Sequence, residues 1–189
     1  MSIQSWQETL ITQQLAGTSF GSFTTAKSVI PPTSLITLPA AFWALGKMMR
    51  VKVAGAIGTL VTTPGTITFQ VMHGSIVVFT TGAIQLNATA HTAIPFELEV
   101  LLTCRIVGSG TTAKLMGQGK VLGIMFTPTA AQVDGVNSHA AMMAPNTTPA
   151  NGTGFDSTIA NILDFWAGFS ISNAANTVLI EQYSVESLN

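Results

Sequence analysis

Two neighbouring residues, Asp164 and Trp166, are the pair in this sequence whose types and spacing best suit recognition of a ligand or another protein. They lie in an alternating stretch, residues 159–171, whose apolar positions are odd-numbered. On a strand, both side chains therefore point away from the core. An exposed Trp beside a carboxylate can stack on a sugar ring or anchor a contact between subunits. We favour the subunit contact, because the low charge of the chain already implies covered surface.

Matches to catalytic and phosphate-binding motifs are better explained as turns. Residues 108–113 (GSGTTA) follow the dinucleotide pattern, but the next residues have extended character instead of the helix whose amides would hold a pyrophosphate. Residues 117–120 (GQGK) lack the spacing and the hydroxyl of a phosphate loop. Residues 17–21 (GTSFG) match a nucleophile elbow, which needs a strand-to-helix turn in an α/β sheet. We therefore expect no catalytic site and no enzymatic activity.

The histidines and the single cysteine do not suggest a metal or cofactor site. His73, His91 and His139 are scattered, with no His-x-His pair and no Glu at ligand spacing. We expect each histidine in a turn or at the surface. Cys104 falls on the apolar face of a strand, where it acts as a small buried hydrophobe, and no disulfide within the chain is possible. No cofactor and no metal are expected.

Charge is unusually scarce in the 189 residues. The 7 Lys and Arg and 8 Asp and Glu make up 8% of the chain, whereas ordinary soluble domains carry about 25%. A lone monomer with so neutral a surface has little to prevent association, so we expect other protein to cover much of it. A net charge of −1 without a basic cluster argues against nucleic acid as a partner. No apolar run approaches the ~20 residues of a membrane span, and the first residues do not resemble a secretory signal.

A long hairpin over residues 96–126 sets the fold class. Its first arm alternates strictly, with apolar residues at even positions from Phe96 to Ile106, which predicts a strand half buried against a core. The turn residues 108–112 separate it from an extended second arm. Six further strands are expected at residues 34–38, 49–57, 67–71, 75–80, 159–171 and 177–185. About eight antiparallel strands without an interior helix predict an all-β fold, a jelly-roll-like antiparallel β-sandwich. Residues 39–45 are expected to form a helical turn that plugs one end of the core.

The N-terminal residues 1–33 are predicted to form an arm, and residues 34–189 the β-sandwich domain. A capping box at residues 5–8 predicts a short helix that Gly17 ends. Its apolar side would carry Trp6, Leu10, Ile11 and Leu15. Such a short helix is marginal alone in water, so it lies either on its own domain or on a neighbouring molecule.

A long stretch rich in Pro, Gly and Asn, residues 127–157, is predicted to be a contact loop. Loops of this length are uncommon in compact domains and are usually functional or disordered. Residues 140–143 (AAMM) include Met142 and Met143, apolar side chains that a solvated loop has no reason to display. The candidate assembly contacts are therefore Trp6, Leu10, Ile11, Leu15, Met142, Met143, Asp164 and Trp166.

The hairpin PFELEVLLTCRIVGSGTTAKLMGQGKV and the closing segment LDFWAGFSISNAANTVLIEQYSVESL resemble virion structural proteins of tailed bacteriophages. Residues 38–79 are similar to the front half of the same group, so the resemblance covers about residues 34–126 and 152–186. The resemblance is one of hydrophobic spacing and glycines. It implies a jelly-roll-like sandwich built into the head surface or the tail of a phage particle, and it carries no active site.

These observations together predict a non-enzymatic structural component of a bacteriophage particle, assembled in the host cytoplasm. We expect a capsid decoration or spike protein that binds the head surface as a homo-oligomer, with a trimer favoured. Its partners would be other virion proteins, such as the major capsid protein. The alternative is a carbohydrate- or receptor-binding tail protein that uses Trp166, Asp164 and the loop.

Overall fold

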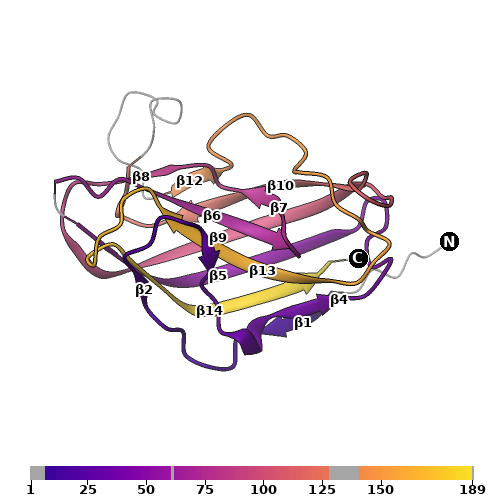
Figure 1. Ribbon diagram of the computed structural model, residues 1–189, viewed down its shortest axis with the longest axis horizontal. Coiled ribbons are helices and arrows are strands. Elements are labelled where there is room, and N and C mark those ends of the chain that lie inside the picture. Colours follow the sequence, from indigo (N-terminus) through magenta and orange to yellow (C-terminus); the bar gives the residue numbers. More distant parts are fainter. Residues whose placement is uncertain (1–6, 61, 128–140, 189) are drawn as a thin grey trace.

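A computed structural model describes residues 7–60, 62–127 and 141–188. The chain folds into two antiparallel sheets that stack face to face (Figure 1). The all-β class and the pair of antiparallel sheets predicted from the sequence are confirmed. The described residues contain one short helical element, η1 (Pro32–Ser34), and no helix among them is long and apolar enough to cross a membrane.

The first sheet has seven strands, in the order β1-β14-β5-β9-β10-β12, with β2 also paired to β14. The strands are β1 (Glu8–Thr12), β2 (Phe20–Gly21), β5 (Met48–Thr59), β9 (His91–Ile106), β10 (Lys114–Leu122), β12 (Ala141–Ala144) and β14 (Thr177–Ser187).

The second sheet also has seven strands, in the order β11-β8-β6-β13-β3, with β4 paired to β13 and β7 to β6. The strands are β3 (Lys27–Ser28), β4 (Ile36–Leu38), β6 (Thr66–His73), β7 (Ile76–Thr80), β8 (Ile84–Leu86), β11 (Phe126–Thr127) and β13 (Asn161–Phe169). All eight strands expected from the sequence are present, and the six additional ones are β1, β2, β3, β8, β11 and β12.

The core lies between the sheets and follows the alternation in the sequence. On β9, Phe96, Leu98, Val100, Leu102 and Cys104 are all buried, while the residues between them face outward. β9 and β10 pair as the expected hairpin. Its turn contains Gly110 at φ +63°, a left-handed conformation that glycine adopts without strain.

The helix expected after residue 5 is wrong in the part that the structure describes. Residues Glu8–Thr12 form β1 and pair with β14 at the edge of the first sheet. The edge of an existing sheet offers this segment backbone hydrogen bonds, and Leu10 and Ile11 pack against the core from it. A helix of three turns lacks that support. Trp6 lies outside the described residues.

The rest of the expected arm lies on its own domain. β3 pairs with β13, and Val29 and Ile30 are 0% and 4% exposed within the core. Lys27 places its ammonium 4.4 Å from the ring centre of Phe23, whose ring packs edge-on against Phe169. The described part of residues 1–33 therefore contributes strands to both sheets.

Two further expectations need correction. Residues 39–45 form turns instead of a helical turn, with Ala41 at φ +56°, although Trp43 does plug the core at 4% exposure. Within the expected contact loop, residues 128–140 lie outside the described part, and Ala141–Ala144 form β12 against β10. Pairing with β10 buries Met142 in the core and leaves Met143 63% exposed.

Candidate binding surfaces

The outer face of the first sheet carries a chain of ion pairs across four neighbouring strands. Arg50 on β5 lies between two carboxylates: its Nε is 3.2 Å from Oε1 of Glu99 on β9, and its Nη1 donates to Oε2 of Glu186 on β14 at 3.1 Å. Lys120 on β10 places Nζ 3.5 Å from Oε2 of Glu99. Partly exposed pairs contribute about 0–1 kcal/mol each. The ion-pair chain therefore adds little to stability. Its charged groups make this face polar.

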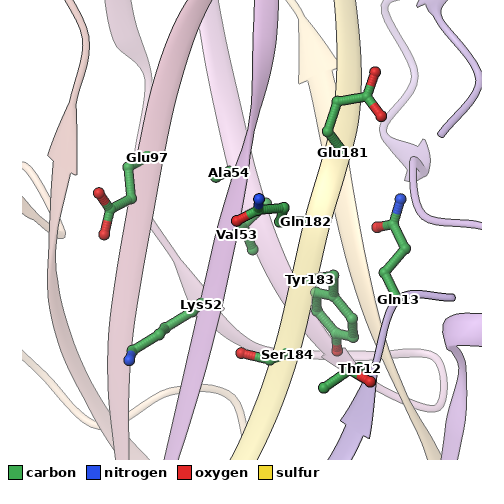
Figure 2. Close-up of a pocket in the computed structure, with 10 residues that line it drawn as sticks. All are labelled: Thr12, Gln13, Lys52, Val53, Ala54, Glu97, Glu181, Gln182, Tyr183 and Ser184. Carbon is green, nitrogen blue, oxygen red and sulfur yellow. The ribbon is translucent and has the colours of Figure 1, made fainter. Parts of the chain in front are cut away.

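A hollow of about 430 Å³ lies on the same face (Figure 2). It is lined by Thr12, Gln13, Lys52, Val53, Ala54, Glu97, Glu181, Gln182, Tyr183 and Ser184. Figure 2 shows Lys52 and Glu97 projecting on one side of the hollow and Gln13 and Glu181 on the other. The side chains of Lys52, Glu97 and Glu181 form no ion pair or hydrogen bond with any described residue. Their charges are therefore available to a ligand.

A small residue and a β-bulge shape this hollow. Ala54 stands between Gln182 and Glu97 in the cross-strand register, so its short side chain leaves a depression between two longer ones. The pairing of β14 with β5 shifts between Ile180 and Gln182, which makes Glu181 an extra residue at the bulge. The Gln13 amide nitrogen donates to the carbonyl oxygen of Ile180 at 3.0 Å and holds the segment after β1 in place.

On the outer face of the second sheet, every charged side chain among the described residues already has a partner within the chain. Lys27 and Asp164 are the only charged residues in its strands. The ammonium of Lys27 lies over two Phe rings, and Asp164 is fully hydrogen-bonded. The other outward residues are neutral, such as Thr66, Thr68 and Gln70 on β6. A surface with so little charge has little to prevent association with other protein. This face therefore suits coverage by protein.

Asp164 and Trp166 point outward, as the sequence predicts, but they hydrogen-bond to each other and to the N-terminal segment. Nε1 of Trp166 donates to Oδ2 of Asp164 at 2.6 Å, and Oγ of Ser28 donates to Oδ1 at 2.8 Å. The backbone N–H of Phe165 also donates to Oδ1 at 2.7 Å. Both side chains are half-buried. This network fastens β3 to β13, which is a structural role.

One end of the sandwich displays a group of large aliphatic side chains, which we call the aliphatic end. It is the right-hand end in Figure 1, where the turns 39–47 and 106–113 and the segment 155–162 meet. Backbone hydrogen bonds join these segments, including Gly46 N–H to Cys104 O at 2.9 Å and Ser157 N–H to Gly108 O at 2.9 Å. The exposed members are Leu45 (74%), Ile106 (40%), Val107 (44%), Ile159 (52%) and Ile162 (44%).

His73 lies beneath this end and is buried, contrary to the expectation of a turn or surface residue. It is 2% exposed and its ring centre is 4.6 Å from that of Phe155. Burial lowers the pKa of His73 to about 4. Its Nδ1 has no partner among the described residues, and neither does the nearby indole nitrogen of Trp43. At neutral pH the imidazole is therefore uncharged and packs as a core residue.

The sequence carries a signal both for the burial of His73 and for the bulge at Glu181. His73 continues the inward series Ile67, Phe69 and Val71, so alternation alone places it in the core. On the last strand the buried apolar positions are even-numbered at Val178 and Ile180 but odd-numbered at Tyr183 and Val185. This change from even to odd positions marks the bulge. The hollow itself has no sequence signal, because its residues come from four separate segments.

The other candidate contact residues are spread over the molecule. Leu10 and Ile11 are half-buried against the core, and Leu15 is 58% exposed. Met142 belongs to the core, whereas Met143 faces outward beside Lys120 on the first sheet. The structure does not bring these residues together with Asp164 and Trp166 in one surface.

No group of three or more His, Cys, Asp or Glu among the described residues is arranged to hold a metal ion. Cys104 is buried as expected, and burial raises the pKa of its thiol, which keeps it protonated.

Comparisons with known proteins give little guidance. No protein-family model matches the sequence, and no curated protein matches it significantly. Among solved structures, the chain is similar to the CBM2 module of the evolved Dit of Lactobacillus casei BL23 phage J-1, with 9% identity, 99% of each chain covered and a TM-score of 0.39. A likeness of this size carries no argument about function.

Proposed function

We propose that this chain is a non-enzymatic structural component of a bacteriophage particle, a jelly-roll-like sandwich that works as an oligomer. The observation that carries the proposal is the unequal distribution of charge. Seven of the fifteen charged residues lie on or beside the outer face of the first sheet: Arg50, Lys52, Glu97, Glu99, Lys120, Glu181 and Glu186. The outer face of the second sheet, whose strands hold only Lys27 and Asp164 as charged residues, is left to be covered.

The aliphatic end has the composition of an interface. Its exposed aliphatic side chains are bordered by Lys47, Arg105 and Asp156, an apolar centre with a polar rim. Monomeric proteins rarely expose several large aliphatic side chains together. Together with the sequence resemblance to phage virion proteins, this favours a capsid decoration or spike protein that contacts its own copies, as a trimer, and the major capsid protein.

The test is the native mass of the full chain in solution, with two charge-introducing variants. Leu45→Lys places a charge on the aliphatic end, and Thr68→Lys places one on the outer face of the second sheet. Gln118→Lys, on the exposed outer face of the first sheet, is the matched control. We expect a closed oligomer that the first or second variant dissociates and the control does not. A monomer at high concentration, or an oligomer that all three variants leave intact, would contradict the proposal.

The second candidate function is a carbohydrate- or receptor-binding tail protein. Its support is the open hollow with Lys52, Glu97 and Glu181, whose side chains have no ion-pair or hydrogen-bond partner among the described residues. Trp166 supports it less than the sequence suggests, because its indole N–H is already bound to Asp164. A glycan array with the wild-type chain, Lys52→Ala in the hollow and Trp166→Phe on the second sheet tests this candidate: glycan binding that either substitution abolishes would favour the tail protein.

A further inference from the structure

The hollow of Figure 2 adjoins a second hollow on the outer face of the first sheet, and we call the two together the groove. The second hollow, of about 480 Å³, is lined by Ala54, Pro95, Phe96, Glu97, Leu122, Gly123, Ile124 and Ala141. Ala54 and Glu97 line both hollows. The two depressions therefore adjoin over β5 and β9 on one face of the sheet.

Register fixes the direction of this groove. One cross-strand row runs through Gln182, Ala54, Glu97, Leu122 and Ala141, on β14, β5, β9, β10 and β12 in that order. The two hollows lie along this row and together span the five strands, with the Glu97 side chain standing where they meet. With neighbouring strands about 4.8 Å apart, the length of the groove is about 19 Å, which an extended chain of about six residues spans.

The two ends of the groove differ in chemistry. The β14 end carries Glu181 and Glu97 against a single Lys52, so it has an excess of negative charge that no described residue neutralises. The β12 end is aliphatic, with Leu122, Pro95 and Ile124, the last of which is 62% exposed. A ligand that is basic at one end and aliphatic at the other matches this arrangement.

The lining favours a peptide over a sugar. The aromatic residues among the described lining, Phe96 and Tyr183, are 4% and 2% exposed, so no ring is presented for a sugar to stack on. The β12 end of the groove, with Leu122 and Ile124, offers a contact for a Leu, Ile or Val side chain instead. Because the groove lies on the face of the sheet and not at its edge, recognition would rest on side chains.

We propose that this groove binds an extended segment of about six residues from a partner protein, with Lys or Arg over Glu97 and Glu181 and an aliphatic residue beside Ile124 and Leu122. The proposal deepens the proposed function by giving the assembled protein a second, peptide-binding contact. It does not depend on the aliphatic end or on the oligomeric state. The two proposals therefore fail separately.

The test uses synthetic seven-residue peptides and the full chain, with binding followed by fluorescence polarisation at low salt. One set of peptides carries Arg or Lys near one end and Leu, Ile or Val near the other, with Ser, Thr and Gly between them. Each peptide is made with the basic residue at the N-terminal end and again with it at the C-terminal end. Matched sets replace the basic residue by Glu or the aliphatic residue by Ser. We expect the basic–aliphatic set to bind and each replacement to weaken binding at least about fivefold.

Variants of the groove locate the binding. Ala54→Arg fills its centre and should weaken binding more than tenfold. The double variant Glu97→Gln/Glu181→Gln should weaken it about three- to tenfold and reduce its salt dependence. Glu8→Gln, at an exposed carboxylate that lines neither hollow, is the matched control and should bind as wild type.

Three outcomes would overturn the proposal. One is that no peptide of the basic–aliphatic set binds. Another is that peptides bind equally to wild type and Ala54→Arg, which places them elsewhere. The third is that a glycan binds in their place and Ala54→Arg abolishes that binding, which assigns the groove to a sugar. Circular dichroism of each variant ensures that a loss of binding is not a loss of fold.

Discussion

The carboxylate of Asp164 accepts a hydrogen bond of 2.6 Å from the indole nitrogen of Trp166, two residues further along the same strand. The same carboxylate accepts a second bond from Ser28. This pairing ties the N-terminal segment to the central strand of the second sheet. Both outward side chains thus have hydrogen-bond partners within the chain.

Replacement of Asp164 by Ala should therefore destabilise the fold, because it leaves Trp166 Nε1 and Ser28 Oγ without their partner. We expect a loss of about 1–3 kcal/mol in the free energy of unfolding, measured by urea denaturation. Trp166→Phe, which keeps the ring but removes the donor, should cost less. Unchanged stability in both variants would show that the network is not formed in solution.

The stability of the protein should fall as the pH drops from about 6.5 to about 4. Burial lowers the pKa of His73 to about 4, below its value of 6.5 in the unfolded chain, so the folded state binds fewer protons in this window. The contribution of neutral His73 is fully present above pH 6.5 and is lost as pH falls toward 4, by up to about 3 kcal/mol.

Thermal melts of wild type and His73→Gln over this pH range measure the effect. The variant cannot acquire a buried charge there, so its melting temperature should depend less on pH than that of wild type. Parallel pH profiles for wild type and His73→Gln would remove His73 from the explanation.

Asp156 affects stability only at lower pH. Hydrogen bonds from Thr158 and Gly110 lower its pKa, so its contribution is lost only below its unfolded value near 3.8.

Deletion of residues 1–30 should unfold or strongly destabilise the domain. It removes β1, β2 and β3 together with Val29 and Ile30, whose side chains are in the core. Burial of an aliphatic side chain contributes about 1.5–3 kcal/mol, so two of them make up much of the stability of a typical domain. Far-ultraviolet circular dichroism and a melt of the truncated chain test this. A cooperative transition at the wild-type temperature would restore the view of a detachable arm.

Gly117 should not tolerate a larger side chain. It faces inward on β10, and a Cβ atom there would overlap the ring of Phe79 on β7. Gly117→Val should force that ring aside and cost about 1–3 kcal/mol. Gly110→Ala, in the open turn of the hairpin, tests a different effect, since only its positive φ opposes substitution. Equal stability of wild type and Gly117→Val would mean that the two sheets are not packed so closely at this point.

Alternation in the sequence is sufficient to predict the fold class and the inward residues of the long strands. Strict alternation from Phe96 to Cys104 and from Leu163 to Phe169 leaves one apolar face on each strand, and burial of that face is the dominant favourable term in folding. The hairpin turn followed from its glycines, because few other residues adopt the backbone that it needs.

The tertiary structure decided what local patterns leave open. Residues Glu8–Thr12 satisfy a helical pattern locally, yet the free edge of β14 turns them into a strand. Met142 looks exposed in a polar loop until β12 pairs with β10 and carries it into the core. The groove depends on which residues stand opposite one another on five strands. Register between distant segments is set by packing of the whole sheet, and no short stretch of sequence contains it.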